Sequence, residues 1–187
     1  MKKLLFMIAI IGLSGCGGGG SSSSDPTSLI DPDYTVEQIE DDLELPPEPE
    51  ETHPDYNTYN SVDSNNNKIR DSVERYIGFK HYPDKQEIAI LNGLAKASFE
   101  RQEAYESGDM VKYKAGMQSV FKAMLCYNYF YNGHAIDDIL SQIKDTEERK
   151  TNYRKNSNKA LSGTGLISFS SPTNGLDEYC KEGFNIK

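Results

Sequence analysis

Apolar residues recur at helical spacing through most of the chain from residue 57 onward. Ile69, Val73 and Ile77 lie four residues apart and therefore share one face of a helix. The segment 81–87, HYPDKQE, interrupts this pattern, and its Pro83 and acidic residues suit the first turn of a new helix. The pattern predicts two helices joined by a proline-containing turn. The apolar stripe of the second comprises Ile88, Leu91, Leu94, Ala95, Phe99 and Tyr105.

A third helix follows the Ser-Gly-Asp segment at 107–109, which combines a helix stop with a new N-cap. It is the most apolar of the predicted helices, and the Asn-Gly pair at 132–133 ends it. Its stripe comprises Met110, Tyr113, Met117, Val120, Phe121 and Met124.

A fourth helix is expected to begin near Ala135 and to continue to about Leu161, although its apolar stripe fades after Ile143. Short connections between consecutive helices favour antiparallel neighbours. The sequence therefore predicts an all-α domain over residues 57–187, built as a roughly four-helix bundle. The last 25 residues are rich in turn residues and predict a C-terminal loop packed on the bundle rather than another long helix.

The charge of the chain is concentrated ahead of this domain. The formal net charge is −9, and residues 25–56 hold twelve Asp and Glu and no Lys or Arg, whereas residues 57–187 hold seventeen acids and eighteen bases. A near-neutral domain argues against nucleic acid as a partner. The Gly/Ser run at 17–24 and the acidic stretch after it predict a disordered, extended tether over residues 16–56. Within it, residues 35–45 could form one short helix capped by Thr35.

The first sixteen residues have the pattern of an export signal. Lys2 and Lys3 precede an apolar run that is too short to span a bilayer, and the run ends in Leu-Ser-Gly-Cys at 13–16. This ending resembles the lipobox of bacterial lipoproteins. The resemblance implies that residues 1–15 are a signal peptide and that Cys16 becomes an acylated N-terminus, with Gly17 favouring the outer membrane, periplasm-facing or at the cell surface. The alternative is an ordinary cleaved signal that leaves Cys16 as a thiol.

With Cys16 acylated, Cys126 and Cys180 remain. A pair of cysteines in an oxidising compartment predicts a disulfide, which would staple the C-terminal loop to the third helix. The alternative is a nucleophilic Cys126 working with His134. The sequence shows no nucleophile elbow, no paired-histidine zinc motif and no glycine-rich phosphate loop, so a non-enzymatic role is expected.

Residues 63–74, DSNNNKIRDSVE, place oxygen-bearing side chains at alternate positions before a helix. The spacing resembles the calcium loops of EF-hand proteins and thrombospondin type 3 repeats. The resemblance implies a weak structural calcium site, in which Lys68 stands where the pattern has Gly and two Asn replace Asp. The alternative is that Asn66 or Asn67 caps a helix beginning at Ile69. The implied ligands are Asp63, Asn65, Asn67, the carbonyl of Ile69, Asp71 and Glu74.

Thr146, Arg149 and Tyr153 line one face of the fourth helix, and the segment 161–163, Leu-Ser-Gly, follows them. A calcium-type loop with such a Thr-x-x-Arg helix and a Leu-Ser-Gly end resembles envelope lipoproteins of Gram-negative bacteria. The resemblance implies no activity. A polar network that closes one end of the bundle is the favoured interpretation of this face.

Together these features predict a cell-envelope protein held to the membrane by acylated Cys16, with a helical domain that binds a partner, such as another envelope protein. One alternative is a periplasmic immunity protein against a delivered toxin. Another is an enzyme acting on envelope polymers or lipids, which a deep pocket with a strongly perturbed carboxylate or histidine would favour.

Overall fold

A computed structural model of the chain describes residues 26–131, 133–154 and 175–186. Every regular element in these residues is helical, and no strand occurs among them. The predicted all-α fold is confirmed. No helix in the described ranges is both long enough and apolar enough to span a bilayer.

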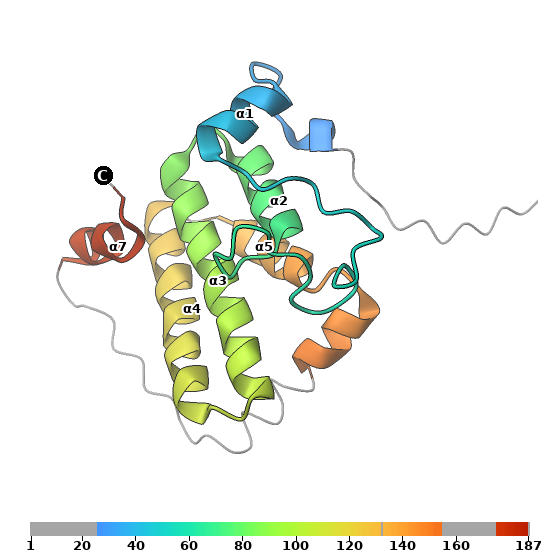
Figure 1. Cartoon of the computed structure of the whole chain (residues 1–187). Coiled ribbons are helices and arrows are strands. Elements are labelled where there is room, and N and C mark those ends of the chain that lie inside the picture. The colour runs from blue at the N-terminus through green and yellow to red at the C-terminus, as the bar shows by residue number, and fades with distance from the viewer. Residues whose placement is uncertain (1–25, 132, 155–174, 187) are drawn as a thin grey trace, which may run out of the picture.

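The centre of the fold is a pair of long antiparallel helices, α3 (Lys85–Glu106) and α4 (Met110–Phe130), which lie side by side in Figure 1. Asp109 begins α4 as its N-cap, because its side chain accepts a hydrogen bond from the Lys112 backbone N–H at 3.0 Å. Gly108 before it has a φ of +74°, a conformation that glycine adopts without strain. The Ser-Gly-Asp segment therefore makes the tight turn that the sequence predicts.

Two shorter helices complete the bundle around this pair. They are α2 (Asp71–His81) and α5 (Ala135–Ile143), and both contact α3. Most of the apolar stripes meet in a main core that excludes water, and this burial is the main stabilising term of such a fold. The fully buried members of this core include Val73, Ile77, Ile90, Leu91, Leu94, Ala95, Ala123, Ile139 and Ile143. Tyr113, Tyr105, Met110 and Met117 instead pack in a second, smaller cluster, and Phe121 of the predicted stripe is exposed.

The fourth predicted helix is divided in the structure. Helix α5 ends at Ile143, and residues 147–154 form a separate helix. The break occurs because Thr146 starts the second helix as a new N-cap, its hydroxyl accepting a hydrogen bond from the Arg149 backbone N–H at 3.2 Å. The predicted continuation of one helix through Thr146 is therefore wrong, and its expected end at Leu161 lies outside the described residues.

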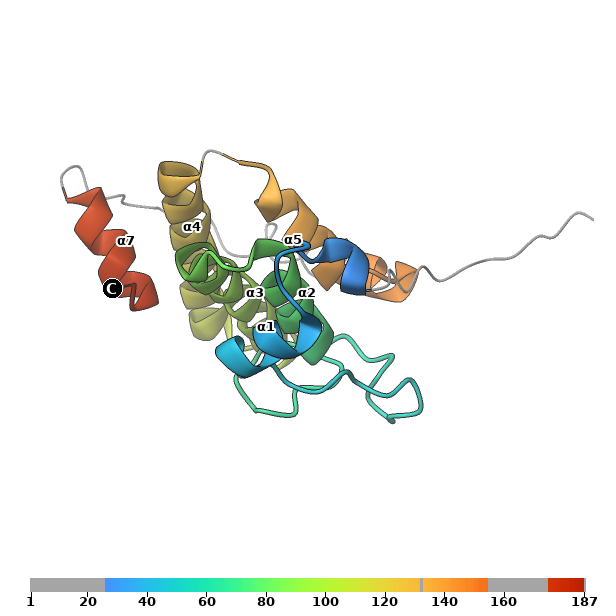
Figure 2. The same ribbon diagram turned by 90° about the horizontal axis from the view of Figure 1, so that it is seen from above.

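The structure also corrects the boundary predicted at Tyr56. Helix α1 (Val36–Leu43) lies across one end of the bundle, as Figures 1 and 2 show, with Ile39 fully buried. Thr35 caps it as the sequence predicts, and Gln38 completes a capping box. Residues 26–56 are therefore part of the folded unit, and not of an extended tether.

Arg75 of α2 holds this acidic segment in place. Its Nε donates to Glu48 at 2.7 Å, its Nη2 to Glu40 at 2.6 Å, and its Nη1 to the carbonyl of Pro46 at 2.8 Å. The guanidinium thus uses all three nitrogens to join residues 40, 46 and 48 of the segment to the bundle. The composition of the acidic segment predicts that it repels itself and stays extended. That prediction fails because composition cannot show that Arg75, on another helix, neutralises two of the acids.

The C-terminal residues form a short helix, α7 (Leu176–Phe184), which lies beside α4 in both views. Cys180 of α7 and Cys126 of α4 form the predicted disulfide, with a Cα–Cα distance of 5.5 Å. Both cysteines are fully buried, which rules out Cys126 as a free nucleophile. The expected C-terminal loop is thus in part a helix, stapled to the bundle.

Candidate functional site

The loop at 63–74 leads into α2 and folds around its own polar side chains. Both oxygens of Asp63 accept backbone N–H groups, one from Asn67 at 3.1 Å and the other from Lys68 at 3.0 Å. On the far side of the loop, the carboxylate of Asp71 accepts the Ser64 N–H at 3.0 Å. The loop is therefore closed by its first and ninth residues, two of the predicted ligand positions.

The other predicted side-chain ligands meet inside this loop. Asn65 and Asn67 each donate an amide N–H to one oxygen of Glu74, at 3.1 and 2.9 Å. The amide oxygens of the two asparagines accept backbone N–H groups, Asn65 from residue 67 and Asn67 from Ile69. The structure thus brings Asn65, Asn67 and Glu74 into direct contact. A metal would need the two amides to turn so that their oxygens replace their N–H groups.

Lys68 holds the sixth position of the loop, where the calcium pattern has glycine. Its φ is +71°, the left-handed conformation that glycine normally supplies there. The backbone therefore adopts this geometry despite a side chain that costs about 1 kcal/mol in it. The ammonium group lies toward α3, with Nζ 3.9 Å from the Glu103 carboxylate.

The loop concentrates negative charge in a poorly hydrated place. Asp71 is fully buried and Glu74 is 8 % exposed. Burial raises the pKa of both carboxyl groups, and the neighbouring charge of Asp63 raises each pKa further, while hydrogen bonds from the loop partly oppose the rise. A cation in the loop would relieve this penalty.

The loop carboxylates do not converge on one point as they stand. Among the described residues, no group of three or more His, Cys, Asp or Glu side chains is gathered as a metal site. The alternative of a capped helix beginning at Ile69 is wrong, because α2 begins at Asp71 and no side chain caps it. Asn67 instead bonds the backbone two residues ahead, a local turn within the loop.

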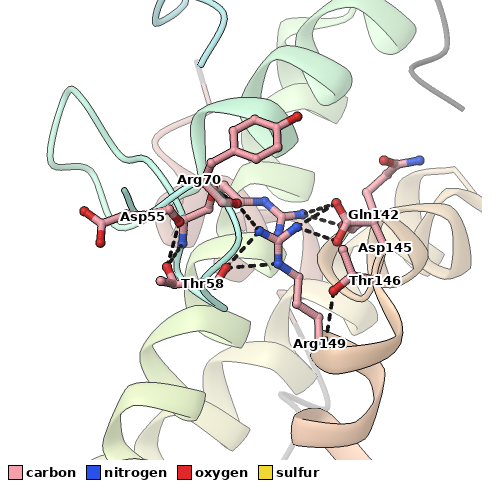
Figure 3. A network of polar contacts seen from close by, with 9 residues as sticks. Asp55, Thr58, Arg70, Gln142, Asp145, Thr146 and Arg149 are labelled. Atoms are coloured by element: carbon pink, nitrogen blue, oxygen red, sulfur yellow. Dashed lines mark hydrogen bonds and ion pairs between the residues drawn. The ribbon is translucent and has the colours of Figure 1, made fainter. Parts of the chain in front are cut away.

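A second polar cluster joins the same end of α2 to the helix at 147–154 (Figure 3). Arg149 is 5 % exposed, and its Nη1 donates to both oxygens of Asp145 at 2.7 and 2.9 Å. Its other nitrogens donate to carbonyls ahead of the loop, Nη2 to Tyr56 at 2.6 Å and Nε to Thr58 at 3.0 Å. Arg149 therefore fastens residues 56–58 to the helix at 147–154.

Arg70 enters the same cluster from the end of the loop, and Figure 3 shows both guanidinium groups directed at Asp145. Its Nη2 donates to Asp145 at 3.2 Å and to the carbonyl of Gln142 at 2.5 Å. The side chain also lies over the ring of Phe99, 5.9 Å from the centroid. Sequence reasoning missed both Arg70 and Asp145. Of the two, only Asp145 could have been predicted, because its position four residues before Arg149 is the spacing of an ion pair on a helix.

Thr146 and Arg149 thus belong to a polar network, as the sequence predicts. Tyr153 lies beside it in a different role: its ring stacks under Arg101 and Lys144, each cation 4.9 Å from the centroid. The Leu-Ser-Gly segment at 161–163 and the predicted lipidation site Cys16 lie outside the described residues.

At the opposite end of the bundle, two tyrosines at the end of α4, Tyr127 within it and Tyr131 directly after it, bind acids at the start of α3. Tyr127 donates its hydroxyl to Glu87 at 2.8 Å, and Tyr131 donates to Asp84 at 2.9 Å. Burial raises the pKa of both hydroxyl groups. The second oxygen of Glu87 lies 3.1 Å from Nδ1 of His81. These contacts tie three helix ends together.

Comparison of the chain with family models, with curated proteins and with solved structures found no match.

Proposed function

We propose that this protein is a lipid-anchored component of the bacterial cell envelope whose helical domain binds a partner, such as another envelope protein. The observation that carries the proposal is the Leu-Ser-Gly-Cys ending of the apolar run at residues 4–13. An acyl chain contributes about 0.8 kcal/mol per buried methylene, so several chains on Cys16 would anchor the protein stably.

Because residues 26–56 are folded, only a short stretch of chain would separate the domain from an acylated Cys16. The domain could then move only a short distance from the membrane. Ten residues, 16–25, precede the first described helix, Pro26–Leu29. A Gly/Ser-rich chain of that length has a root-mean-square span of roughly 17 Å. The domain would therefore stay close to its membrane, and its partner would be a protein near the same surface.

Metabolic labelling with a palmitate analogue tests the anchor. The wild-type protein is expected to be labelled and to sediment with membranes, and Cys16→Ser is expected to abolish both, because the acyl chains need the cysteine. Ser14→Ala, which keeps the cysteine and the small residues before it, should remain labelled. A wild-type protein that is exported and cleaved but carries no label would rule out the anchor.

We also propose a structural calcium ion in the loop at 63–74. Support comes from the two buried carboxylates, from the left-handed conformation of Lys68, and from the contacts that gather Asn65, Asn67 and Glu74. A hard cation prefers six to eight oxygen ligands, and the loop offers carboxylate, amide and carbonyl oxygens. Its role would be to fix the loop that connects the acidic segment to α2.

Calcium is therefore expected to raise the melting temperature of the Cys16→Ser protein. With a dissociation constant of about 0.5 mM, 5 mM calcium adds about 1.4 kcal/mol, or roughly 3 to 6 °C. Asp63→Ala combined with Glu74→Ala should erase the rise. As a control, Glu148→Ala combined with Glu182→Ala removes two exposed carboxylates and should keep it. Equal melting temperatures with calcium and with chelator would exclude the site.

A further inference from the structure

A cavity of about 100 Å³ lies between the loop at 63–74 and the C-terminal half of α3. Ile69, Arg70 and Phe99 line it and are buried, so they form its floor. The other lining residues are more exposed and form its rim. They are Asn60, Asp63, Lys68, Glu100 and Glu103.

The floor of this cavity contains an incompletely satisfied cation. Arg70 is 2 % exposed, and only its Nη2 has hydrogen-bond partners, whereas its Nε and Nη1 are buried with none among the described residues. A buried donor without a partner destabilises the fold, and does so more when it is charged. Burial accordingly lowers the pKa of the Arg70 guanidinium to about 10, which still leaves it charged at neutral pH.

The charges around the cavity are arranged as a dipole. Behind the floor, Arg70 shares the single carboxylate of Asp145 with Arg149, which does not line the cavity, so one positive charge is in excess. At the rim, the Glu103 carboxylate lies 3.9 Å from the Lys68 ammonium group, and Glu100 has no ion pair among the described residues, so one negative charge is in excess. Asp63 adds a further carboxylate to the rim.

We propose that this cavity binds a small zwitterion of the amino-acid type, with its carboxylate toward Arg70 and its ammonium group toward Glu100 and Glu103. A simple anion would be repelled by the rim, and a simple cation by the floor. An enclosed cavity of about 150 Å³ holds benzene, so a space of about 100 Å³ suits a ligand of the size of glycine or alanine. The proposal goes beyond the lipid anchor and the calcium ion and requires neither.

A heteronuclear NMR titration of the Cys16→Ser protein with glycine tests this inference. Glycine is expected to shift the amide signals of residues near the cavity, including Ile69, Phe99 and Glu103, with a saturable dependence on concentration. Acetate carries only the carboxylate and methylammonium only the cation, so each should bind at least tenfold more weakly. No localised shift at 50 mM glycine would mean that the cavity holds water alone, and would overturn the proposal.

Substitutions at the rim separate a zwitterion site from an anion site. Glu100→Gln with Glu103→Gln removes the charges expected to face the ammonium group, and should weaken glycine binding about tenfold. Both side chains are exposed, so the fold should be kept. Glu148→Gln removes an exposed carboxylate on the helix at 147–154 and should leave binding unchanged. Acetate binding as tightly as glycine, or glycine binding that is unaffected by the double substitution, would overturn the assignment.

Discussion

Replacing both Cys126 and Cys180 with alanine is expected to lower the free energy of unfolding by about 4 kcal/mol, equivalent to a fall of roughly 10 to 15 °C in melting temperature. The disulfide closes a loop of 54 residues in sequence separation, and the unfolded chain regains the freedom of that loop when the bond is absent. Urea unfolding followed by circular dichroism at 222 nm measures the change.

The loss should be concentrated in α7. A helix of nine residues is not stable alone in water, so α7 depends on its attachments. Besides the disulfide, these include the ring of Phe184, which fills the space a Cβ at Gly93 would need, and Lys122, whose Nζ lies 4.1 Å from the Tyr179 ring centroid. Amides of α7 should therefore exchange with deuterium sooner than those of α3 when the disulfide is removed.

Glu182→Ala, an exposed change on the same helix, serves as the control and should leave both measurements unchanged. Protection of α7 that persists in the double variant would show that packing alone holds this helix. In that case the stabilising effect of the disulfide would lie in the bundle as a whole.

The central helices could be predicted from the sequence because their signals are local. The stripe from Ile88 to Phe99 buries one face of α3, and the Ser-Gly-Asp segment at 107–109 supplies both a stop and a cap within three residues. The disulfide was predictable for a similar reason, since Cys126 and Cys180 are the two cysteines that remain once Cys16 is assigned to the lipobox.

The acidic segment could not be placed in this way. Its composition predicts repulsion and extension, but Glu40 and Glu48 are bound by Arg75, which lies 35 and 27 residues away in sequence. Gly78 of α2 also leaves room for the side chain of Leu45. Pairing over such separations is a property of the folded chain, and no period or cap in the sequence signals it.

In the candidate sites, too, the contacts between residues close in sequence could be predicted, and the contacts between distant residues could not. The loop at 63–74 was predicted from spacing, and the structure brings Asn65, Asn67 and Glu74 together within it. The network around Arg149 was predicted only in its local part, Thr146 and Arg149. Arg70 reaches it from 75 residues before Asp145, and the carbonyls of residues 56 and 58 come from farther still.

Disrupting the polar network around Arg149 is expected to lower the stability of the domain almost as much as removing the disulfide. Arg149→Ala is expected to lower the free energy of unfolding by about 3 kcal/mol, because it removes a buried guanidinium that serves one carboxylate and two backbone carbonyls. Arg149→Lys keeps the charge but not the planar fork, so it should recover only part of the loss.

The change should also be local, because Arg149 is what joins residues 56–58 to the helix at 147–154. Amides around Ser61, whose N–H donates to the Thr58 hydroxyl, should lose protection against deuterium exchange before those of α3 do.

Arg154→Ala provides a matched control, since Arg154 is an exposed arginine on the same helix and its loss should change stability by less than about 0.5 kcal/mol. Equal unfolding free energies for Arg149→Ala and Arg154→Ala would show that the network orders this end of the bundle without stabilising it. A large loss confined to Arg149→Ala would show that this arginine stabilises the domain by fastening residues 56–58 to the helix at 147–154.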